Sequence, residues 1–318
     1  MISTLYSVFF WIGLLAVVPY LTLVAYGAYA CQEQDLKKKY NAQWALVTGG
    51  SSGIGAAIVR KLASQKLDVV VVALDDAVLA KFKTEIQKEY PTRQFRFVGC
   101  DLSTPSGDYL DAIKKATSDI TVQILCVNAG FITTGCFADI TFVRNMANYH
   151  TNTTSAVILT HYFLNEMISQ GKKGLITFTS SSAGFIPSPM SALYSSTKIF
   201  LTTFAASLAA ETAEDGIDVL VIHPSPINSN FYSNAGKMSA LHVAHKLSSP
   251  PSVIADTICR NAGKIVVADQ GLITVVMKII FGKILDWNVF AEIMKMGLRY
   301  NSDYKAMKIN RGITDKKL

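Results

Sequence analysis

The chain has 318 residues, half of them hydrophobic, with a mean hydropathy of +0.29 and a formal net charge of +7. This length allows one sizeable core with appendages, and the hydropathy is high for a soluble enzyme. Basic residues cluster at Lys37–Lys39 and near the C-terminus without interleaved aromatic residues or any nucleic-acid motif, so we expect an anionic membrane surface and no nucleic acid as partner. The five cysteines are scattered and odd in number, which argues against a disulfide framework or a zinc site.

The N-terminal segment is the first predicted element. Leu5 to Ala30 contains no charged residue and is long enough to cross a bilayer as a helix. A cleaved signal peptide is the alternative, because Ala28-Tyr29-Ala30 resembles a cleavage site, but the apolar stretch is too long for a typical signal core. Lys37–Lys39 follow it, and the positive-inside rule then predicts a lumenal N-terminus and a cytosolic remainder. We expect residues 1–32 to be an uncleaved membrane anchor.

From residue 40 to residue 268, short apolar runs alternate with helical patterns. This alternation is typical of a parallel sheet covered by helices on both faces, so we predict a doubly wound α/β domain of the Rossmann type. Seven strands are expected, near Trp44–Thr48, Val69–Leu74, Phe95–Cys100, Val122–Val127, Leu175–Ser180, Val219–His223 and Ile265–Val267. Helices are expected near Ile54–Lys66, Ala77–Glu89, Asp108–Thr117, Phe142–Ile168 and Ser195–Ala213.

A glycine-rich turn follows the first predicted strand. Its glycines would let the backbone turn tightly and approach a dinucleotide pyrophosphate, while the next helix directs its N-terminus at the phosphates. Serine hydroxyls in the turn can add hydrogen bonds. The turn therefore predicts a dinucleotide site, and it reads Thr48-Gly49-Gly50-Ser51-Ser52-Gly53-Ile54-Gly55.

Tyr194 and Lys198 are spaced for acid–base chemistry. Residues four apart lie on one face of a helix, so the Lys198 ammonium can stabilise a Tyr194 phenolate and bring the tyrosine pKa toward working pH. Together with the glycine-rich turn, this pair indicates nicotinamide redox chemistry.

These motifs, with Asn128-Ala129-Gly130 and Ser180-Ser181-Ser182, occur in an order that resembles the short-chain dehydrogenase/reductase family over Trp44 to Val267. The resemblance implies that Tyr194 protonates a substrate carbonyl as hydride arrives. It also implies that Ser181, thirteen positions before Tyr194, binds that carbonyl. Lys198 would tune Tyr194 and hold the nicotinamide ribose. Asn152 would anchor a water-linked proton path to Lys198.

The resemblance also implies a set of cofactor contacts, with NADPH or NADH as the cofactor. Asp75 and Asp76 at the end of the second strand weakly favour NADH, whereas lipid reductases of the family use NADPH and often have Arg where Leu74 stands. Both acids could equally be turn residues or a helix cap. The cofactor-binding residues expected are Thr48, Gly49, Ser51, Ser52, Gly53, Ile54, Gly55, Asp75, Asp101, Leu102, Asn128, Ala129, Gly130, Tyr194, Lys198, Pro224 and Ile227.

Two further departures from the family pattern occur, at Val127 and Ser225. A segment expected to form a substrate lid follows Ser225. Val127 stands where many members have Asn, which we interpret as a structural change. Ser225 replaces the usual glycine after Pro224, which leaves the local backbone geometry open. Ile227–Lys246 should form the lid, and its histidines, His242 and His245, lack an evident third ligand, so we expect no metal.

The C-terminal part, residues 269–318, is expected to be a hydrophobic and basic extension. Gly271–Arg299 has the apolar bulk and interspersed lysines of a helix at a membrane interface, with core packing or a dimer contact as alternatives. A near-dilysine ending, Asp315-Lys316-Lys317-Leu318, weakly favours the endoplasmic reticulum. We expect an endoplasmic reticulum membrane protein with a cytosolic catalytic domain, which is a homo-oligomer.

This combination resembles the membrane-anchored lipid reductases of the family. We predict reduction of a 3-oxoacyl-CoA in long-chain fatty acid elongation, as in very-long-chain 3-oxoacyl-CoA reductases related to 17β-hydroxysteroid dehydrogenases. The alternatives are a 3-ketodihydrosphingosine reductase and a hydroxysteroid or retinol dehydrogenase. A non-catalytic, cofactor-binding membrane scaffold is a hypothesis of another class.

Overall fold

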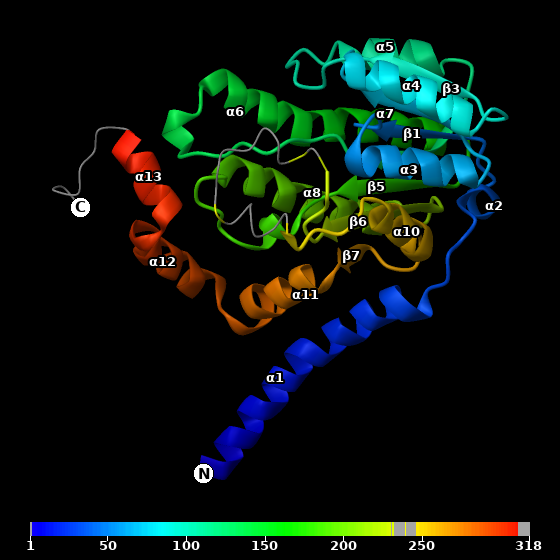
Figure 1. Cartoon of the computed structure of the whole chain (residues 1–318). Coiled ribbons are helices and arrows are strands. Elements are labelled where there is room, and N and C mark those ends of the chain that lie inside the picture. Colours follow the sequence, from blue (N-terminus) through cyan, green and yellow to red (C-terminus); the bar gives the residue numbers. More distant parts are fainter. Residues whose placement is uncertain (1, 230, 232–238, 240–245, 311–318) are drawn as a thin grey trace.

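Seven parallel strands form one sheet, as the alternation of apolar runs and helices predicts, and their order is β3-β2-β1-β4-β5-β6-β7. The structure is a computed structural model that describes residues 2–229, 231, 239 and 246–310. Figure 1 shows the sheet between two layers of helices. The strands are β1 Trp44–Thr48, β2 Asp68–Ala73, β3 Phe95–Gly99, β4 Val122–Val127, β5 Gly174–Thr179, β6 Ile217–Pro224 and β7 Val267–Gln270.

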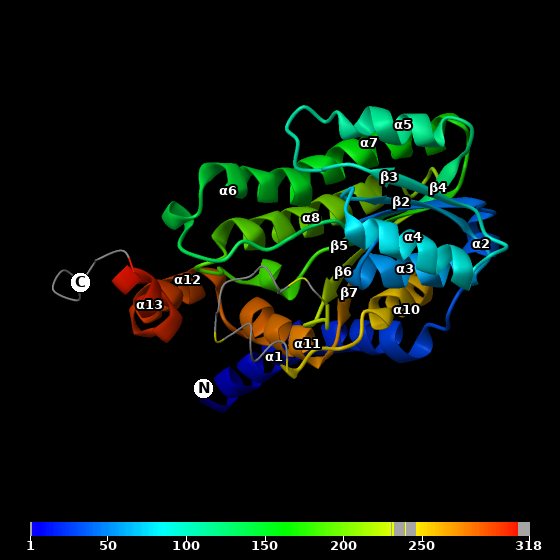
Figure 2. The same cartoon turned by 45° about the horizontal axis from the view of Figure 1, so that its top comes forward.

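The helices fall into two groups around the sheet, and Figure 2 shows α5, α7 and α8 on one side and α3, α4 and α10 on the other. The α-helices are α1 Ile2–Ala25, α2 Leu36–Tyr40, α3 Gly53–Ser64, α4 Ala77–Glu89, α5 Tyr109–Thr117, α6 Phe142–Tyr149, α7 Ser155–Ser169, α8 Ala192–Glu211, α10 Ser252–Asn261, α11 Leu272–Ile279, α12 Trp287–Gly297 and α13 Ser302–Asn310. Short 3₁₀ segments are η2 Phe137–Asp139, η4 Ser182–Phe185 and η7 Leu298–Tyr300, and π-helical segments are η1 Tyr26–Ala30, η3 His150–Thr154 and η6 Ile280–Ile284.

The central strands are buried on both faces. In β1, Ala45 and Val47 belong to the core cluster that includes α3, α4 and α10, whereas Trp44 and Leu46 belong to the cluster on the side of α5, α7 and α8. Successive side chains of a strand point to opposite faces, so a strand covered on both sides must be apolar throughout. This explains why the strands read as continuous hydrophobic runs.

The sheet order brings the sequence motifs together. The order reverses between β1 and β4, and a crevice for ligands is expected at the carboxyl ends of the strands at such a point. The glycine-rich turn follows β1, Asn128 follows β4, Ser180 follows β5 and Pro224 ends β6. All four segments therefore lie along the same edge of the sheet.

The ends of several elements lie up to three residues from their predicted bounds and α10 is not among the predicted helices, and two further differences have an identifiable physical reason. The seventh strand begins at Val267 instead of Ile265, because the amides of Lys264 and Ile265 bond to Asn261 and prolong the turn after α10. The long helix predicted over Phe142–Ile168 is divided into α6 and α7 by the π-helical segment η3. The hydrophobic pattern continues through η3, so it does not reveal this change of helical geometry.

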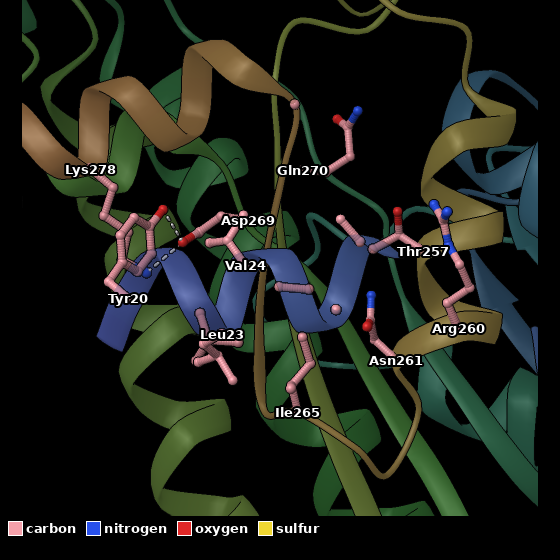
Figure 3. Close-up of a pocket in the computed structure, with 15 residues that line it drawn as sticks. Tyr20, Leu23, Val24, Thr257, Arg260, Asn261, Ile265, Asp269, Gln270 and Lys278 are labelled. Atoms are coloured by element: carbon pink, nitrogen blue, oxygen red, sulfur yellow. Dashed lines mark hydrogen bonds and ion pairs between the residues drawn. The ribbon is translucent and has the colours of Figure 1, made fainter. Parts of the chain in front are cut away.

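The N-terminal helix has two halves with different surroundings. The stretch Phe10–Ala30 is long and apolar enough to cross a membrane. Figure 1 shows the first half of α1 extending away from the rest of the chain. The second half docks on the domain through one face, which lines a crevice with α10, β7 and α11 (Figure 3). The lining residues have the spacing of a single helical face and are Tyr20, Leu23, Val24, Gly27 and Ala28.

Gly27 sets the close approach of this docked half. A Cβ atom at Gly27 would lie 2.9 Å from Ile265 Cδ1 and 3.0 Å from Asn261 Oδ1, so a larger residue would push the helix away. The described side chains from Tyr6 to Pro19 are exposed except for Ala16 and Val17, which are half-buried, and the helical stretch Ile2–Pro19 is about 27 Å long at about 1.5 Å per residue. This is close to the thickness of a bilayer core, about 30 Å.

The C-terminal segment is not one continuous helix. Asp286 interrupts it and caps α12, with its Oδ1 accepting from the amides of Asn288 (2.9 Å) and Val289 (3.2 Å). Thr274 is buried against Ser225 of the domain, and Phe290 is buried against the Phe281 ring within the C-terminal segment, with ring centres 4.5 Å apart. Large apolar side chains nevertheless remain exposed along α11, η6 and α12, namely Leu272, Val276, Ile280, Ile284, Trp287, Val289, Ile293 and Met296.

Candidate active site

The glycine-rich turn has the geometry that a phosphate site needs. Gly49 (φ 64°) and Gly53 (φ 51°) are in the left-handed region, which glycine adopts without strain. A Cβ atom at Gly55 would clash with the Gly49 carbonyl oxygen, so only glycine lets α3 start this close to β1. Ser52, the N-cap residue of α3, makes no capping bond with its side chain. The first amides of α3 are therefore available to an anion.

Thr48 and Asn128 connect the strand ends beneath the crevice. Thr48 Oγ1 accepts from the amides of Asn128 (2.9 Å) and Ala129 (3.0 Å), and Asn128 Nδ2 donates to the Thr48 carbonyl (3.1 Å). Thr179 Oγ1 donates to Asn128 Oδ1 (3.1 Å). These bonds link β1, β4 and β5. Both predicted cofactor residues thus use their side chains to hold the sheet edge together.

At the end of β2, the two aspartates have different surroundings. Asp76 is the N-cap of α4 and its Oδ1 accepts from the Leu79 amide at 2.9 Å. Asp75 and Leu74 are exposed at the strand end, and Asp75 lies beside Gly99 of β3. Of the two aspartates, Asp75 is therefore the candidate for a ribose contact.

The segment after β3 holds the predicted adenine contacts. Asp101 Oδ1 accepts from the Ser103 amide (2.8 Å) in a local turn. Leu102 is buried in the core cluster that contains α5 and α7. Asp101 itself is exposed, so its carboxylate lies at the surface beside the carboxyl end of the sheet.

Tyr194 and Lys198 lie in the first two turns of α8 and are both buried. Lys198 Nζ is 5.7 Å from the centre of the Tyr194 ring and donates to the Thr179 carbonyl at 2.9 Å. Burial lowers the pKa of Lys198 to about 8. The Phe231 ring lies 5.9 Å from the Tyr194 ring. The pair is thus enclosed and close to the carboxyl end of β5.

Asn152 lies in the π-helical segment η3 and faces the same region. Its Nδ2 donates to Thr197 Oγ1 (3.0 Å) and to the Phe131 carbonyl (3.2 Å), and its Oδ1 accepts from the Phe131 amide (3.1 Å). A Cβ atom at Gly130 would lie 2.9 Å from Asn152 Oδ1 and 3.4 Å from Lys198 Nζ. Gly130 therefore permits the close packing of Asn152 and Lys198. Single π-turns of this kind are frequent at functional sites.

The three consecutive serines have different surroundings. Ser180 is buried, and its hydroxyl donates to the Lys198 carbonyl at 2.6 Å. Ser181 is partly exposed and its Oγ accepts from the Ala183 amide at 3.1 Å, which leaves its proton able to donate to a ligand. This difference agrees with the choice of Ser181 as the carbonyl-binding residue.

Ser225, which replaces the usual glycine after Pro224, is accommodated by α11. Its Oγ lies 3.0 Å from Thr274 Oγ1 and accepts from the Thr274 amide at 3.2 Å. A side chain at Gly271 would collide with Ser225, and Gly271 has φ 84°. The departure from the family pattern is thus compensated within the chain.

The first residue of the lid predicted over Ile227–Lys246 pairs with a residue just after the lid. Ile227 is buried and forms a parallel bridge to Ser249. Much of the lid, including His242 and His245, lies outside the described residues. Within the described part of the chain, no cluster of three or more His, Cys, Asp or Glu side chains could hold a metal.

Sequence reasoning missed one buried polar pair beside this site. His223 near the end of β6 and Asp269 in β7 are 2.6 Å apart, between His223 Nδ1 and Asp269 Oδ1. His223 lies in a strand that the sequence predicts, whereas Asp269 lies two residues beyond the predicted strand Ile265–Val267, in the predicted C-terminal extension; the observed β7 continues to Gln270. Nothing in the local sequence shows that these two residues would pair.

Comparisons with known proteins agree with this geometry. The family pattern described as short chain dehydrogenase matches residues 43–240. The chain is 30% identical to a very-long-chain 3-oxoacyl-CoA reductase of Laccaria bicolor over 238 residues, 71% of this chain and 66% of that protein. It is 29% identical to putative steroid dehydrogenase 2 of Caenorhabditis elegans over 213 residues, 64% of this chain and 66% of that protein. The match therefore spans 66% of the length of each relative.

One of the solved structures similar to this chain contains a nicotinamide cofactor. A short-chain dehydrogenase from Sphingobium yanoikuyae in complex with NADPH has a TM-score of 0.64 and 25% identity, over 71% of this chain and 87% of that chain. The family pattern covers more than half of the 318 residues, and the open helix N-terminus and the buried tyrosine–lysine pair lie on the same sheet edge. The chain therefore belongs to the short-chain dehydrogenase family and is a nicotinamide-dependent oxidoreductase.

Proposed function

We propose that this chain is a membrane-anchored reductase that converts a 3-oxoacyl-CoA into the corresponding 3-hydroxyacyl-CoA during fatty acid elongation. The buried Tyr194–Lys198 pair beside Ser181 carries the proposal of carbonyl reduction. The lipid substrate is supported by the names of the relatives and by the apolar helix α1. The same residues suit a 3-ketodihydrosphingosine or retinol substrate, and the relative named a steroid dehydrogenase keeps a hydroxysteroid as the second candidate.

In the proposed reaction, each catalytic residue has a separate role. The Ser181 hydroxyl donates to the substrate carbonyl oxygen and orients it. A bound nicotinamide would supply the hydride that the carbonyl carbon receives. Tyr194 donates its hydroxyl proton to the oxygen, which completes the secondary alcohol, and the Lys198 ammonium stabilises the phenolate that remains. Asn152 fixes Thr197 and the Phe131 backbone next to Lys198, where a water-linked proton path would start. A non-catalytic scaffold would not need all four residues.

We propose that the cofactor lies along the sheet edge already described. The amides and hydroxyls from Gly49 to Gly55 would bind the pyrophosphate, and Asp75 would face the adenosine ribose. Asp101 and Leu102 would flank the adenine. Asn128, Ala129 and Gly130 would support the middle of the cofactor. At the nicotinamide end, the candidates are Pro224, Ile227, Tyr194 and Lys198.

The proposed location is the endoplasmic reticulum membrane, with the catalytic domain in the cytosol. Lys37–Lys39 stand directly after the apolar helix, and all three are in α2. The exposed apolar side chains of α11 and α12 would lie at the membrane interface, where Trp287 is a favourable anchor. On this reading, residues 1–32 anchor the domain of residues 40–268, and residues 269–318 rest on the bilayer.

Tyr194→Phe removes the transferable proton while keeping the ring. We expect reduction of a 3-oxoacyl-CoA to fall by about a hundredfold or more, because a positioned acid contributes that much. Cofactor affinity and thermal stability should stay near wild type. Initial rates and cofactor titrations measure this, with Tyr90→Phe as a distant control. Activity within about tenfold of wild type would refute the role of Tyr194.

The buried Lys198 makes stability depend on pH in a defined window. Its pKa falls from 10.5 to about 8 on folding, so between these values the folded chain binds fewer protons than the unfolded chain, and stability rises with pH. The wild type should gain on the order of 3 kcal/mol over that window relative to Lys198→Met. Urea unfolding in detergent at several pH values measures the difference. Parallel curves for the two proteins would contradict the burial of a titrating amine.

The choice between NADPH and NADH should depend on the end of β2. Leu74→Arg combined with Asp75→Ser adds a partner for the 2′-phosphate and removes a repulsive carboxylate, so the ratio of kcat/KM for NADPH over NADH should rise. Asp76→Ser is the matched control, because Asp76 caps α4 and serine is also a good cap. If the double variant and the control change the ratio equally, the side chains at the end of β2 do not contact the adenosine ribose.

The topology can be tested in microsomes. A cytosolic domain should be digested by added protease without detergent, while the chain stays uncleaved and unglycosylated at Asn152-Thr153-Thr154, its glycosylation sequon. Asn152 is buried, so glycosylation would have to precede folding. A protease-protected domain, or a mature chain that begins at Cys31, would overturn both the anchor and the orientation.

A further inference from the structure

The docked half of the membrane helix reaches a buried carboxylate. Tyr20 Oη donates to Asp269 Oδ2 at 2.9 Å, and Figure 3 shows this bond from the helix to the strand behind it. Lys278 Nζ lies 2.9 Å from the same oxygen and 5.5 Å from the centre of the Tyr20 ring. Asp269 is on β7 and Lys278 is on α11. One carboxylate thus joins α1, β7 and α11.

The other oxygen of Asp269 holds His223 of β6. The two side chains are 0% and 2% exposed, so their 2.6 Å hydrogen bond is shielded from water. A charged carboxylate can only accept, so His223 Nδ1 carries the proton and donates it. Burial lowers the pKa of His223, and nearby Lys278 lowers it further against the opposing effect of Asp269. His223 is therefore neutral, and its Nε2 is an acceptor.

Through Nε2 and a threonine, His223 reaches the backbone of Lys198. Thr202 Oγ1 is 2.8 Å from His223 Nε2 and 3.0 Å from the Lys198 carbonyl oxygen. That carbonyl also accepts from Ser180 Oγ at 2.6 Å, and Ser180 Oγ lies 3.0 Å from Thr202 Oγ1. Because His223 Nε2 is an acceptor, Thr202 donates its single hydroxyl proton to His223, and Ser180 is the hydroxyl that donates to the Lys198 carbonyl. Thr202 lies one turn after Lys198 in α8, so its bond to His223 fixes this part of the helix next to the Lys198 carbonyl.

The same histidine also contacts the segment that carries Ser181. The His223 ring packs edge-on against Phe185 at the end of η4, with ring centres 4.6 Å apart. Lys278 Nζ lies 5.0 Å from the centre of the Phe185 ring on the side of α11. A shift of Asp269 would therefore move His223. The movement of His223 would change the position of Thr202 next to Lys198 and the position of Phe185 at the end of η4.

We propose that Tyr20, Asp269, His223 and Thr202 form a positioning network, through which docking of the membrane helix holds Lys198 in its catalytic geometry. None of the four is expected to touch the substrate. The proposal rests on the proposed role of Lys198 in holding the nicotinamide ribose. Its consequence is that the anchor contributes to catalysis directly, in addition to holding the enzyme at a membrane.

The test uses the full chain in detergent micelles and measures cofactor Kd by fluorescence, kcat, KM and thermal stability. Tyr20→Phe removes one hydroxyl from the half-buried start of the network. We expect a three- to tenfold higher cofactor Kd and a similar loss of kcat, about the size that coupled networks produce, with KM for the acyl substrate little changed. Tyr29→Phe is the matched control on the same segment, because Tyr29 is 90% exposed. It should match the wild type.

Thr202 provides the second arm. Thr202→Val should lower cofactor affinity and kcat, and Thr202→Ser should restore both, because only the hydroxyl matters. Combining Tyr20→Phe with Thr202→Val should be no worse than the stronger single variant, since both interrupt the same network. Multiplying effects in the double variant, or a change in thermal stability without a change in Kd and kcat, would refute the network.

A separate variant distinguishes this proposal from that of the catalytic residues. Lys198→Ala should weaken cofactor binding more than either network variant. If Lys198→Ala leaves the cofactor Kd unchanged, the proposed role of Lys198 is wrong. If Lys198→Ala weakens binding while Tyr20→Phe and Thr202→Val do not, the network alone is wrong.

Discussion

Burial of the Lys198 ammonium is the interaction on which the rest of the site depends. A buried amine needs hydrogen-bond partners in place before it can be charged, and the chain provides the Thr179 carbonyl for this purpose. Thr179 in turn binds Asn128, which binds Thr48. The hydrogen bonds that connect the ends of β1, β4 and β5 therefore include Thr179, whose carbonyl also accepts from Lys198. Glycine at position 130 is needed because the amine and Asn152 occupy the space that a side chain would fill.

The apolar N-terminal helix packs against the domain in addition to being connected to it by the chain. One face of the stretch Tyr20–Ala28 packs on β7, α10 and α11, whereas most of the described side chains before Tyr20 are exposed. In the proposed membrane-anchored form, this docking places the membrane surface close to the edge of the sheet and restricts rotation of the domain beneath it. An exposed apolar stripe on α11 and α12 lies on the segment that follows β7. The docked half of the N-terminal helix and the start of α11 thus both lie beside β7.

Much of this could be predicted from the sequence, because strands buried on both faces and glycine-rich turns leave local patterns. The seven-stranded doubly wound sheet follows from such patterns, whereas the roles of Ser181, Tyr194 and Lys198 are inferred from the resemblance to a family. The helix break at Asn152 could not be predicted, because a π-turn keeps the same hydrophobic residues. The pairing of His223 with Asp269 depends on two strands brought together by the fold, 46 positions apart in the chain. Long-range polar pairs have no local signal.

Ser225 and Gly271 limit which residues each position can carry. The serine hydroxyl occupies the space that a side chain at position 271 would take, and it satisfies the Thr274 amide at the start of α11. A chain with glycine at position 225 could carry a larger residue at 271, provided that the backbone there can keep its left-handed φ. Once serine is present, that freedom is lost. A side chain at position 271 therefore requires both the loss of the Ser225 hydroxyl and a backbone that tolerates the left-handed φ, so a single substitution at Gly271 should destabilise the junction between β6 and α11.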